Sequence, residues 1–287
     1  MENNVVDIEM EYFKRKNKEA YDKLVNKEFE SVKELLVEPI SKINEQFGEE
    51  QFKEVKKYCP QNIFEAAIFL NFLEPKAKDN DFASINYYDF YLMNAASNYN
   101  LGNLKESKID YKKAIKFNPA SSVARLQVLE IDKREKEFST FVDDIKELFK
   151  YAYRRRDIAL AYRDLGYYLV EIEDYEMAIV AYYLSNIYEV TEKSLEEIKN
   201  ISETAKIDLE SKQWLSEEMM GELYNKYKVP LLPDQNLVKL SVAMAKDAYE
   251  KKAYQTSLFS YQIAYELTLE EEYGEKIKEL AEKIKKL

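Results

Sequence analysis

A segment of 32 residues occurs three times along this chain with the same order of large and small side chains. The copies are residues 88–119, 159–190 and 238–269, which lie 71 and then 79 residues apart. The matched positions, in chain order, are Tyr91 and Tyr162; Ala95, Gly166 and Ala245; Gly102, Glu173 and Lys252; Leu104, Tyr175 and Tyr254; Ser107, Ala178 and Ser257; Tyr111, Tyr182 and Tyr261; and Ala114, Ser185 and Ala264.

This order predicts two helices joined by a short turn. A small residue in the first helix lets the second helix approach closely, and the small, aromatic and small residues of the second helix share one face. In the first copy Pro119 ends the unit, because proline disfavours the α conformation at Asn118. Further helices are also expected between the copies, as helix pairs at 121–157 and 194–228, and the second pair is followed by a linker at 229–236.

The repeated segment resembles the tetratricopeptide repeat (TPR) family, whose pattern is W-x₂-L-G-x₂-Y…A-x₃-F…P over 34 residues. The copy with most matches has Tyr162, Leu165, Gly166, Ala178, Tyr182 and Ser185 at the expected spacings. No copy begins with Trp, and only the first ends in Pro. The resemblance implies a right-handed α-solenoid, with clear copies near 88–121, 159–192 and 238–271.

Composition also favours an all-α fold, because Gly and Pro together supply only 11 of 287 residues. We predict an N-terminal helical region of degenerate repeats at 1–80, TPR-like repeats at 81–270 and a capping helix at 271–287. Residues 74–84 are the expected boundary, and residues 63–73 a buried helix. Helix breaks are expected at Pro39, Pro60 and Pro75.

The last predicted helix has an apolar stripe, formed by Ile277, Leu280, Ala281, Ile284 and Leu287. A solenoid needs such a helix to cover its final repeat. The alternative is a helix that binds a partner or dimerises.

Several function classes are disfavoured by what the chain lacks. It has no histidine, which removes the common nucleophile systems and His-containing zinc sites. It has no glycine-rich phosphate loop. We therefore expect no enzyme activity, no metal and no cofactor. A net charge of −11 argues against nucleic acid, since affinity there comes from basic residues.

No segment is long enough to predict membrane insertion, and the N-terminus does not have the pattern of a signal peptide. Cys59 is the only cysteine, which agrees with a reducing compartment. The expected location is cytoplasmic.

If the resemblance holds, the first helix of each copy lines a concave groove for a protein or peptide partner. The candidate groove residues are Asp89, Leu92, Ala96, Tyr99, Leu160, Arg163, Tyr167, Val170, Lys239, Val242, Lys246 and Tyr249. Tyrosine suits such contacts because it is large, amphipathic and rigid. The alternative is that several of these residues simply pack between repeats.

Two other features have alternative interpretations. The basic run at 150–157 could hold a phosphate or an acidic peptide. We favour a helix C-terminus and turn, where cations complement the helix dipole. Trp214, the only tryptophan, is expected to pack a turn rather than to form an exposed binding hot spot.

The predicted function is a non-catalytic scaffold or adaptor that binds a protein or peptide in its groove. One alternative is a peptide-sensing regulatory protein whose helical N-terminal region is the output. Another is an enzyme of the α-toroid type, which would need a dry pocket lined by carboxylates.

Overall fold

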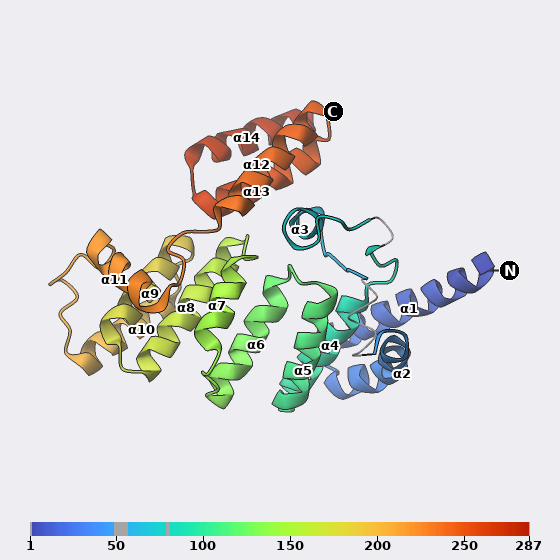
Figure 1. The fold of residues 1–287 in the computed structure, drawn as a ribbon, viewed down its shortest axis with the longest axis horizontal. Coiled ribbons are helices and arrows are strands. Elements are labelled where there is room, and N and C mark those ends of the chain that lie inside the picture. Colours follow the sequence, from blue (N-terminus) through green and yellow to red (C-terminus); the bar gives the residue numbers. More distant parts are fainter. Residues whose placement is uncertain (1, 49–56, 79–80, 287) are drawn as a thin grey trace. The chain divides into compact units, whose positions relative to one another are not determined.

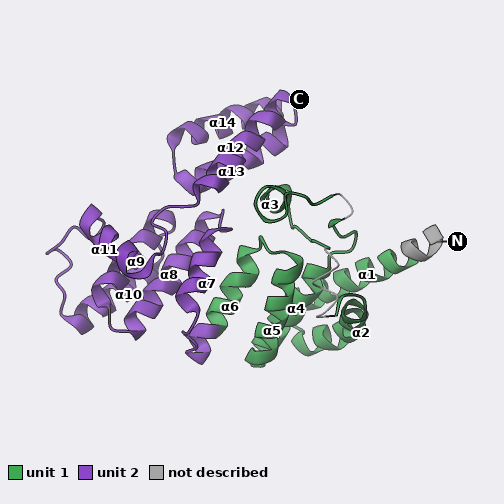
Figure 2. Cartoon of the chain, in the orientation of Figure 1, with its two compact units in different colours: residues 1–131 green, residues 132–287 purple. Residues whose placement is uncertain are grey.

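The computed structural model describes residues 2–48, 57–78 and 81–286, and the fold in these ranges is all-helical (Figure 1). This confirms the all-α prediction. The only β pairing in the described residues is an isolated parallel bridge between Tyr58 and Phe82. The chain forms two compact units, residues 1–131 and 132–287 (Figure 2).

The first unit contains two long helices, a short helix with a π-helical turn, and a second pair of helices. Their bounds are α1 (Glu2–Val25), α2 (Phe29–Phe47), α3 (Ile63–Ile68), the π-helical η2 (Phe69–Leu73), α4 (Tyr87–Asn100) and α5 (Leu104–Phe117). Helix α6 (Ser122–Glu135) begins in this unit and ends in the next.

The second unit continues as helices joined by turns and two longer loops. These helices are α7 (Phe141–Phe149), α8 (Arg155–Glu171), α9 (Tyr175–Tyr188), α10 (Glu192–Ala205), α11 (Glu217–Tyr227), α12 (Gln235–Glu250), α13 (Tyr254–Thr268) and α14 (Glu271–Lys285). The ranges expected to hold helix pairs, 121–157 and 194–228, contain α6 and α7 and then α10 and α11, and the pairing of these helices stays a prediction.

Side chains mark where several helices begin. Asn62, Thr191, Ser216 and Asp234 each accept a backbone N–H of the first turn of α3, α10, α11 and α12. Such caps satisfy N–H groups that have no partner within the helix.

Four helix pairs, α1–α2, α4–α5, α8–α9 and α12–α13, are joined by the same turn. The residue two positions before each second helix has a positive φ: 61° at Lys27, 83° at Gly102, 62° at Glu173 and 60° at Lys252. Each of these residues donates its N–H to the carbonyl three residues earlier, and the next residue donates to the carbonyl five earlier. Glycine reaches this left-handed conformation most easily, so the three other turns hold it at a cost.

Contacts between the paired helices also recur. The Ser107 hydroxyl donates to the Ala95 carbonyl at 2.8 Å, and the Ser257 hydroxyl donates to the Ala245 carbonyl at the same distance. The corresponding positions in α8–α9 are Gly166 and Ala178. A Cβ on Gly166 would lie 2.7 Å from Cε2 of Tyr182, so the absence of a side chain there permits this packing.

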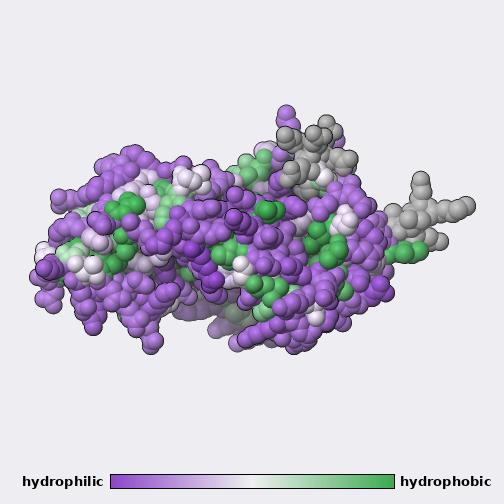
Figure 3. All heavy atoms as spheres, turned by 90° about the horizontal axis from the view of Figure 1, so that it is seen from below, coloured by the Kyte–Doolittle hydropathy of each residue, from purple (hydrophilic) through white to green (hydrophobic). Residues whose placement is uncertain are grey.

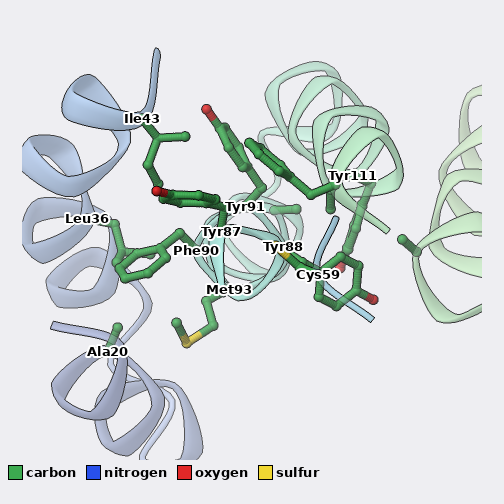
Figure 4. Close-up of a cluster of buried hydrophobic side chains, with 14 of the residues drawn as sticks. Ala20, Leu36, Ile43, Cys59, Tyr87, Tyr88, Phe90, Tyr91, Met93 and Tyr111 are labelled. Atoms are coloured by element: carbon green, nitrogen blue, oxygen red, sulfur yellow. The ribbon is translucent and has the colours of Figure 1, made fainter. Parts of the chain in front are cut away.

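The core of the first unit joins α1, α2, α4 and α5. Phe13, Leu36, Tyr87, Tyr91 and Tyr111 are among its buried side chains, and Figure 4 shows α4 side chains directed toward the neighbouring helices. The phenol of Tyr91 donates to Oδ1 of Asn44 at 2.8 Å, which gives its buried polar atom a partner. The N-terminal helices therefore share one core with the first clear repeat copy.

The last three helices have a smaller core of their own. Ala245, Tyr261 and Leu280 are buried in it, and the half-buried Ile277 packs against them. The predicted apolar stripe of α14 thus packs against α13. Leu287, its last predicted member, lies outside the described residues.

Two local predictions need correction. Pro39 does not break a helix, because it lies buried inside α2, where its fixed φ is compatible with helical backbone. Pro60 and Pro75 do lie outside the helices. Residues 63–73 form α3 and η2 but are not wholly buried. Ile63, Leu70 and Phe72 are 47%, 39% and 44% exposed, because only one face meets the core.

The boundary expected at 74–84 stays a prediction. Residues 79–80 within it lie outside the described residues, and the compact units divide after Ile131.

Candidate functional site

The four candidate groove residues of α4 lie on its less buried side. Asp89, Leu92, Ala96 and Tyr99 are all half-buried, whereas Phe90, Tyr91, Met93 and Ala95 are buried in the core. This division follows from helical periodicity, since residues three and four apart share a face. Leu92 and Tyr99 also pack against the core, so part of their surface is structural.

Asp89 lies in a pocket of about 260 Å³. Oδ2 of Asp89 accepts hydrogen bonds from Nδ2 of Asn86 at 2.7 Å and from Nδ2 of Asn17 at 3.3 Å. Burial raises the pKa of the Asp89 carboxyl, and the hydrogen bond from Asn17 partly offsets this. Lys14 and Lys18 also line the pocket. The pocket is small, and its lining combines these polar groups with the apolar Phe13, Ile85 and Phe90.

Tyr99 has a partner within its own unit. Its phenol donates to Oε1 of Glu130 at 3.2 Å. Replacing Tyr99 would therefore disturb the contact with α6 as well as any binding surface.

The candidate residues of α8 are half-buried, and Arg163 is the most constrained of them. Its Nη1 lies 3.0 Å from Oε2 of Glu189, and its Nη2 donates to the Glu189 backbone carbonyl. The Arg163 side chain is only 17% exposed. This arginine joins α8 to the segment that follows α9, so it is held in place before any partner binds.

Leu160, Tyr167 and Val170 are all half-buried, and Tyr167 also contacts a side chain of another helix. The ammonium of Lys133 lies 5.8 Å from the centre of the Tyr167 ring, within the range of a cation–π contact. Lys133 also forms an ion pair with the buried Asp164. This part of α8 is a packed polar surface.

The candidate residues of α12 are the most accessible. Lys239, Lys246 and Tyr249 are exposed, and Val242 is half-buried. The Lys283 ammonium of α14 donates to the Tyr249 hydroxyl at 3.0 Å and lies over the Tyr249 ring. Of the twelve candidates, the two lysines are therefore the freest to meet a partner.

The basic run at 150–157 is placed differently from our prediction. Lys150 does follow the last residue of α7, as expected for a helix C-terminus. Arg154, Arg155 and Arg156, however, begin α8, so the interpretation that they complement a helix C-terminus is wrong. They lie at the positive end of a helix dipole, where cations are disfavoured.

These arginines line a pocket of about 760 Å³ within the second unit. Its other lining residues are Asn186, Ile187, Tyr188, Glu189, Val190 and Glu266. Nothing local in the sequence could have indicated that Glu266 lies here, because it is 111 residues from Arg155.

Trp214 is buried, as predicted, and its indole N–H donates to the Leu209 carbonyl at 2.8 Å. It packs the loop between α10 and α11. It is not an exposed hot spot.

The described residues contain no group of three or more acidic or cysteine side chains placed to hold a metal ion. Within the same residues, no helix has the length and apolarity needed to cross a membrane. On the face drawn in Figure 3, apolar residues form small separate patches among hydrophilic ones. No protein-family model and no curated protein matched this sequence when it was compared with them.

Proposed function

We propose that this chain is a non-catalytic scaffold that binds a protein or peptide along the first helices of TPR-like repeats. In this proposal the helix pairs stack as a right-handed solenoid, α14 caps it, and the protein acts in the cytoplasm. The proposal takes the three clear copies as α4–α5, α8–α9 and α12–α13.

The observation that supports it best is the repeated turn. Gly102, Glu173 and Lys252 were aligned by sequence alone, and all three have the same left-handed backbone and the same pair of hydrogen bonds. Such left-handed residues are common at helix ends, and Lys136 has the same conformation, so what favours one repeated unit is that the turn falls at the three aligned positions. Lys27 has the same turn, which extends the pattern to α1–α2.

The accessibility of the candidate face gives further support. None of the twelve candidate residues is buried, although their helices supply many core residues. Within the second unit the candidate residues combine lysines, tyrosines and aliphatic side chains, which suits a peptide that carries both acidic and apolar groups.

The shared core of α1, α2, α4 and α5 does not favour the alternative of a separate N-terminal output region. Phe13 and Leu36 would have to leave the aromatic side chains of α4 for those helices to move independently. Ring contacts such as Phe13 with Phe90, at 5.5 Å between centroids, would be lost.

The test is selection of peptides from a displayed library on the immobilised protein, followed by affinity measurements by fluorescence polarisation. The double variant Lys239→Glu/Lys246→Glu reverses two exposed charges on the α12 face. The control Lys278→Glu/Lys285→Glu makes the same charge change at two exposed positions of α14. We expect the first variant to weaken the selected peptides at least about tenfold, since like charges across an interface cost more than a kilocalorie.

The control should retain affinity within about twofold, because it leaves the candidate face intact. If both variants weaken binding equally, only net charge matters and the groove is the wrong surface. If no peptide is selected at all, the scaffold proposal fails.

A further inference from the structure

The arginines of this chain are distributed unevenly. It has seven, Arg15, Arg125, Arg134, Arg154, Arg155, Arg156 and Arg163, so four of the seven fall between positions 154 and 163. All other cationic side chains are lysines. Arginine differs from lysine in its planar fork of donors, which matches carboxylate and phosphate oxygens.

The position of the three consecutive arginines is costly unless an anion is near. Arg154 precedes α8, and Arg155 and Arg156 are its first two residues. Cations there are opposed by the exposed N–H groups and the dipole of the helix, and anions are favoured. A pocket of about 760 Å³ opens directly beside them.

The two carboxylates that line the pocket, Glu189 and Glu266, are already engaged. Glu189 pairs with Arg163, and Arg154 donates its Nε to Asp157, outside the pocket lining, at 2.7 Å. Oε2 of Glu266 accepts the backbone N–H of Arg155 at 3.0 Å. That last contact places a carboxylate of the chain itself at the start of α8, as an anion would be placed.

Two guanidinium groups are left without a carboxylate. Arg155 donates its Nε to the backbone carbonyl of Tyr188 at 3.0 Å, which orients the group but leaves its charge unpaired. Arg156 is exposed, and neither arginine has an ion pair within the described residues. The pocket thus has one oriented and one free guanidinium beside a helix N-terminus.

We propose that this pocket binds an anionic side chain of a polypeptide partner, with Arg155 and Arg156 as its ligands. The shared chemistry is a group of negatively charged oxygens, either a phosphorylated side chain or a carboxylate. The inference rests on the proposed scaffold function only in assigning the anionic group to a polypeptide. None of the twelve candidate groove residues lines this pocket, although Arg163 pairs with Glu189 in its wall.

The first experiment tests the pocket without any partner. Inorganic phosphate is added to the labelled full chain, and the Nε–Hε resonances of the seven arginines are followed by NMR. Those of Arg155 and Arg156 should shift and saturate, whereas Arg15, on an exposed face of α1, should not. Equal shifts at Arg15 would mean general ionic contact and would overturn the proposal.

The second experiment uses a labelled nine-residue peptide with phosphoserine, glutamate or serine at its centre. The double variant Arg155→Gln/Arg156→Gln should weaken the anionic peptides at least about tenfold, because hydrogen bonds to charged groups are worth that much. The control Lys278→Gln/Lys285→Gln removes two exposed charges of α14 in the same unit and should leave affinity within about twofold. The serine peptide should bind neither the wild type nor the variants.

The arms of this experiment separate the possible sources. Binding of the phosphoserine peptide alone indicates a phosphorylated partner, and equal binding of the glutamate peptide indicates an acidic segment. Phosphate shifts without binding of either peptide would support the site and count against the scaffold function. Wild-type affinity in the arginine variant would overturn the proposed site.

A further variant tests the site without touching the arginines. Glu266→Gln removes the negative charge nearest the start of α8, and an amide oxygen can still accept the Arg155 N–H. This variant should bind phosphate more tightly than the wild type. Unchanged or weaker binding would contradict the proposal.

Discussion

Replacing Gly166 by alanine should destabilise the second unit, although alanine is the better helix former. The new Cβ would lie 2.7 Å from Cε2 and 2.8 Å from Cδ2 of Tyr182, whose side chain is buried. Because the ring is rigid, either it or α9 would have to move. Overpacking of this kind costs about 1–3 kcal/mol, whereas the gain in helix propensity is about 1 kcal/mol.

The expected net loss is therefore about 1 kcal/mol in the free energy of unfolding. Gly221 provides a matched control, since it lies inside α11 and a Cβ there would meet nothing within 4 Å. Gly221→Ala should gain up to about 1 kcal/mol, so the two variants should differ by about 2 kcal/mol.

Urea unfolding followed by Trp214 fluorescence and by circular dichroism measures both variants. In Gly166→Ala/Tyr182→Leu, the smaller side chain removes the clash, so the added cost of alanine should vanish. Wild-type or higher stability of Gly166→Ala would refute the idea that the missing side chain sets the spacing of α8 and α9.

Two further predictions concern buried polar groups. Ser107→Ala and Ser257→Ala should each lose about 1 kcal/mol, because each removes one 2.8 Å hydrogen bond at equivalent places in two helix pairs. Urea unfolding checks this, and a loss in only one variant would contradict the equivalence. Burial raises the pKa of the Asp110 carboxyl, with hydrogen bonds from Asn94 and Asn98 opposing the shift. Folding therefore favours its protonated form, and its contribution to stability falls as pH rises above about 4. The free energy of unfolding of Asp110→Asn minus that of the wild type should therefore increase from pH 4 to pH 7. A difference that stays constant with pH would exclude this effect.

The sequence could predict the helix pairs because their signals are local and occur three times. Gly102 marks one turn plainly, and alignment carried that assignment to Glu173 and Lys252, where no single residue would have indicated a left-handed turn. The burial of Ala95 and Tyr111 likewise follows from their spacing.

Features that depend on distant residues could not be predicted. Helix α8 begins at Arg155, within the range 121–157 that the sequence assigned to the preceding helix pair, and the carboxylate that accepts the Arg155 N–H comes from the distant Glu266. The rule that proline interrupts helices predicts a break at Pro39, but this residue lies buried within α2. The partners of Arg163 and Asp89, namely Glu189 and Asn17, come from other helices or from the segments beside them.

The core formed by α12, α13 and α14 also bears on how the chain opens. The buried cluster that joins these three helices is small, with Ala245, Tyr261 and Leu280, whereas the core of the first unit contains many aromatic side chains. Amide hydrogens of these three helices should thus exchange through local openings that leave the rest folded, because the free energy of such openings follows the apolar surface they expose. The carboxylate of Glu266 would leave the N–H of Arg155 in each such opening, so fraying of the C-terminal helices would periodically uncover the start of α8.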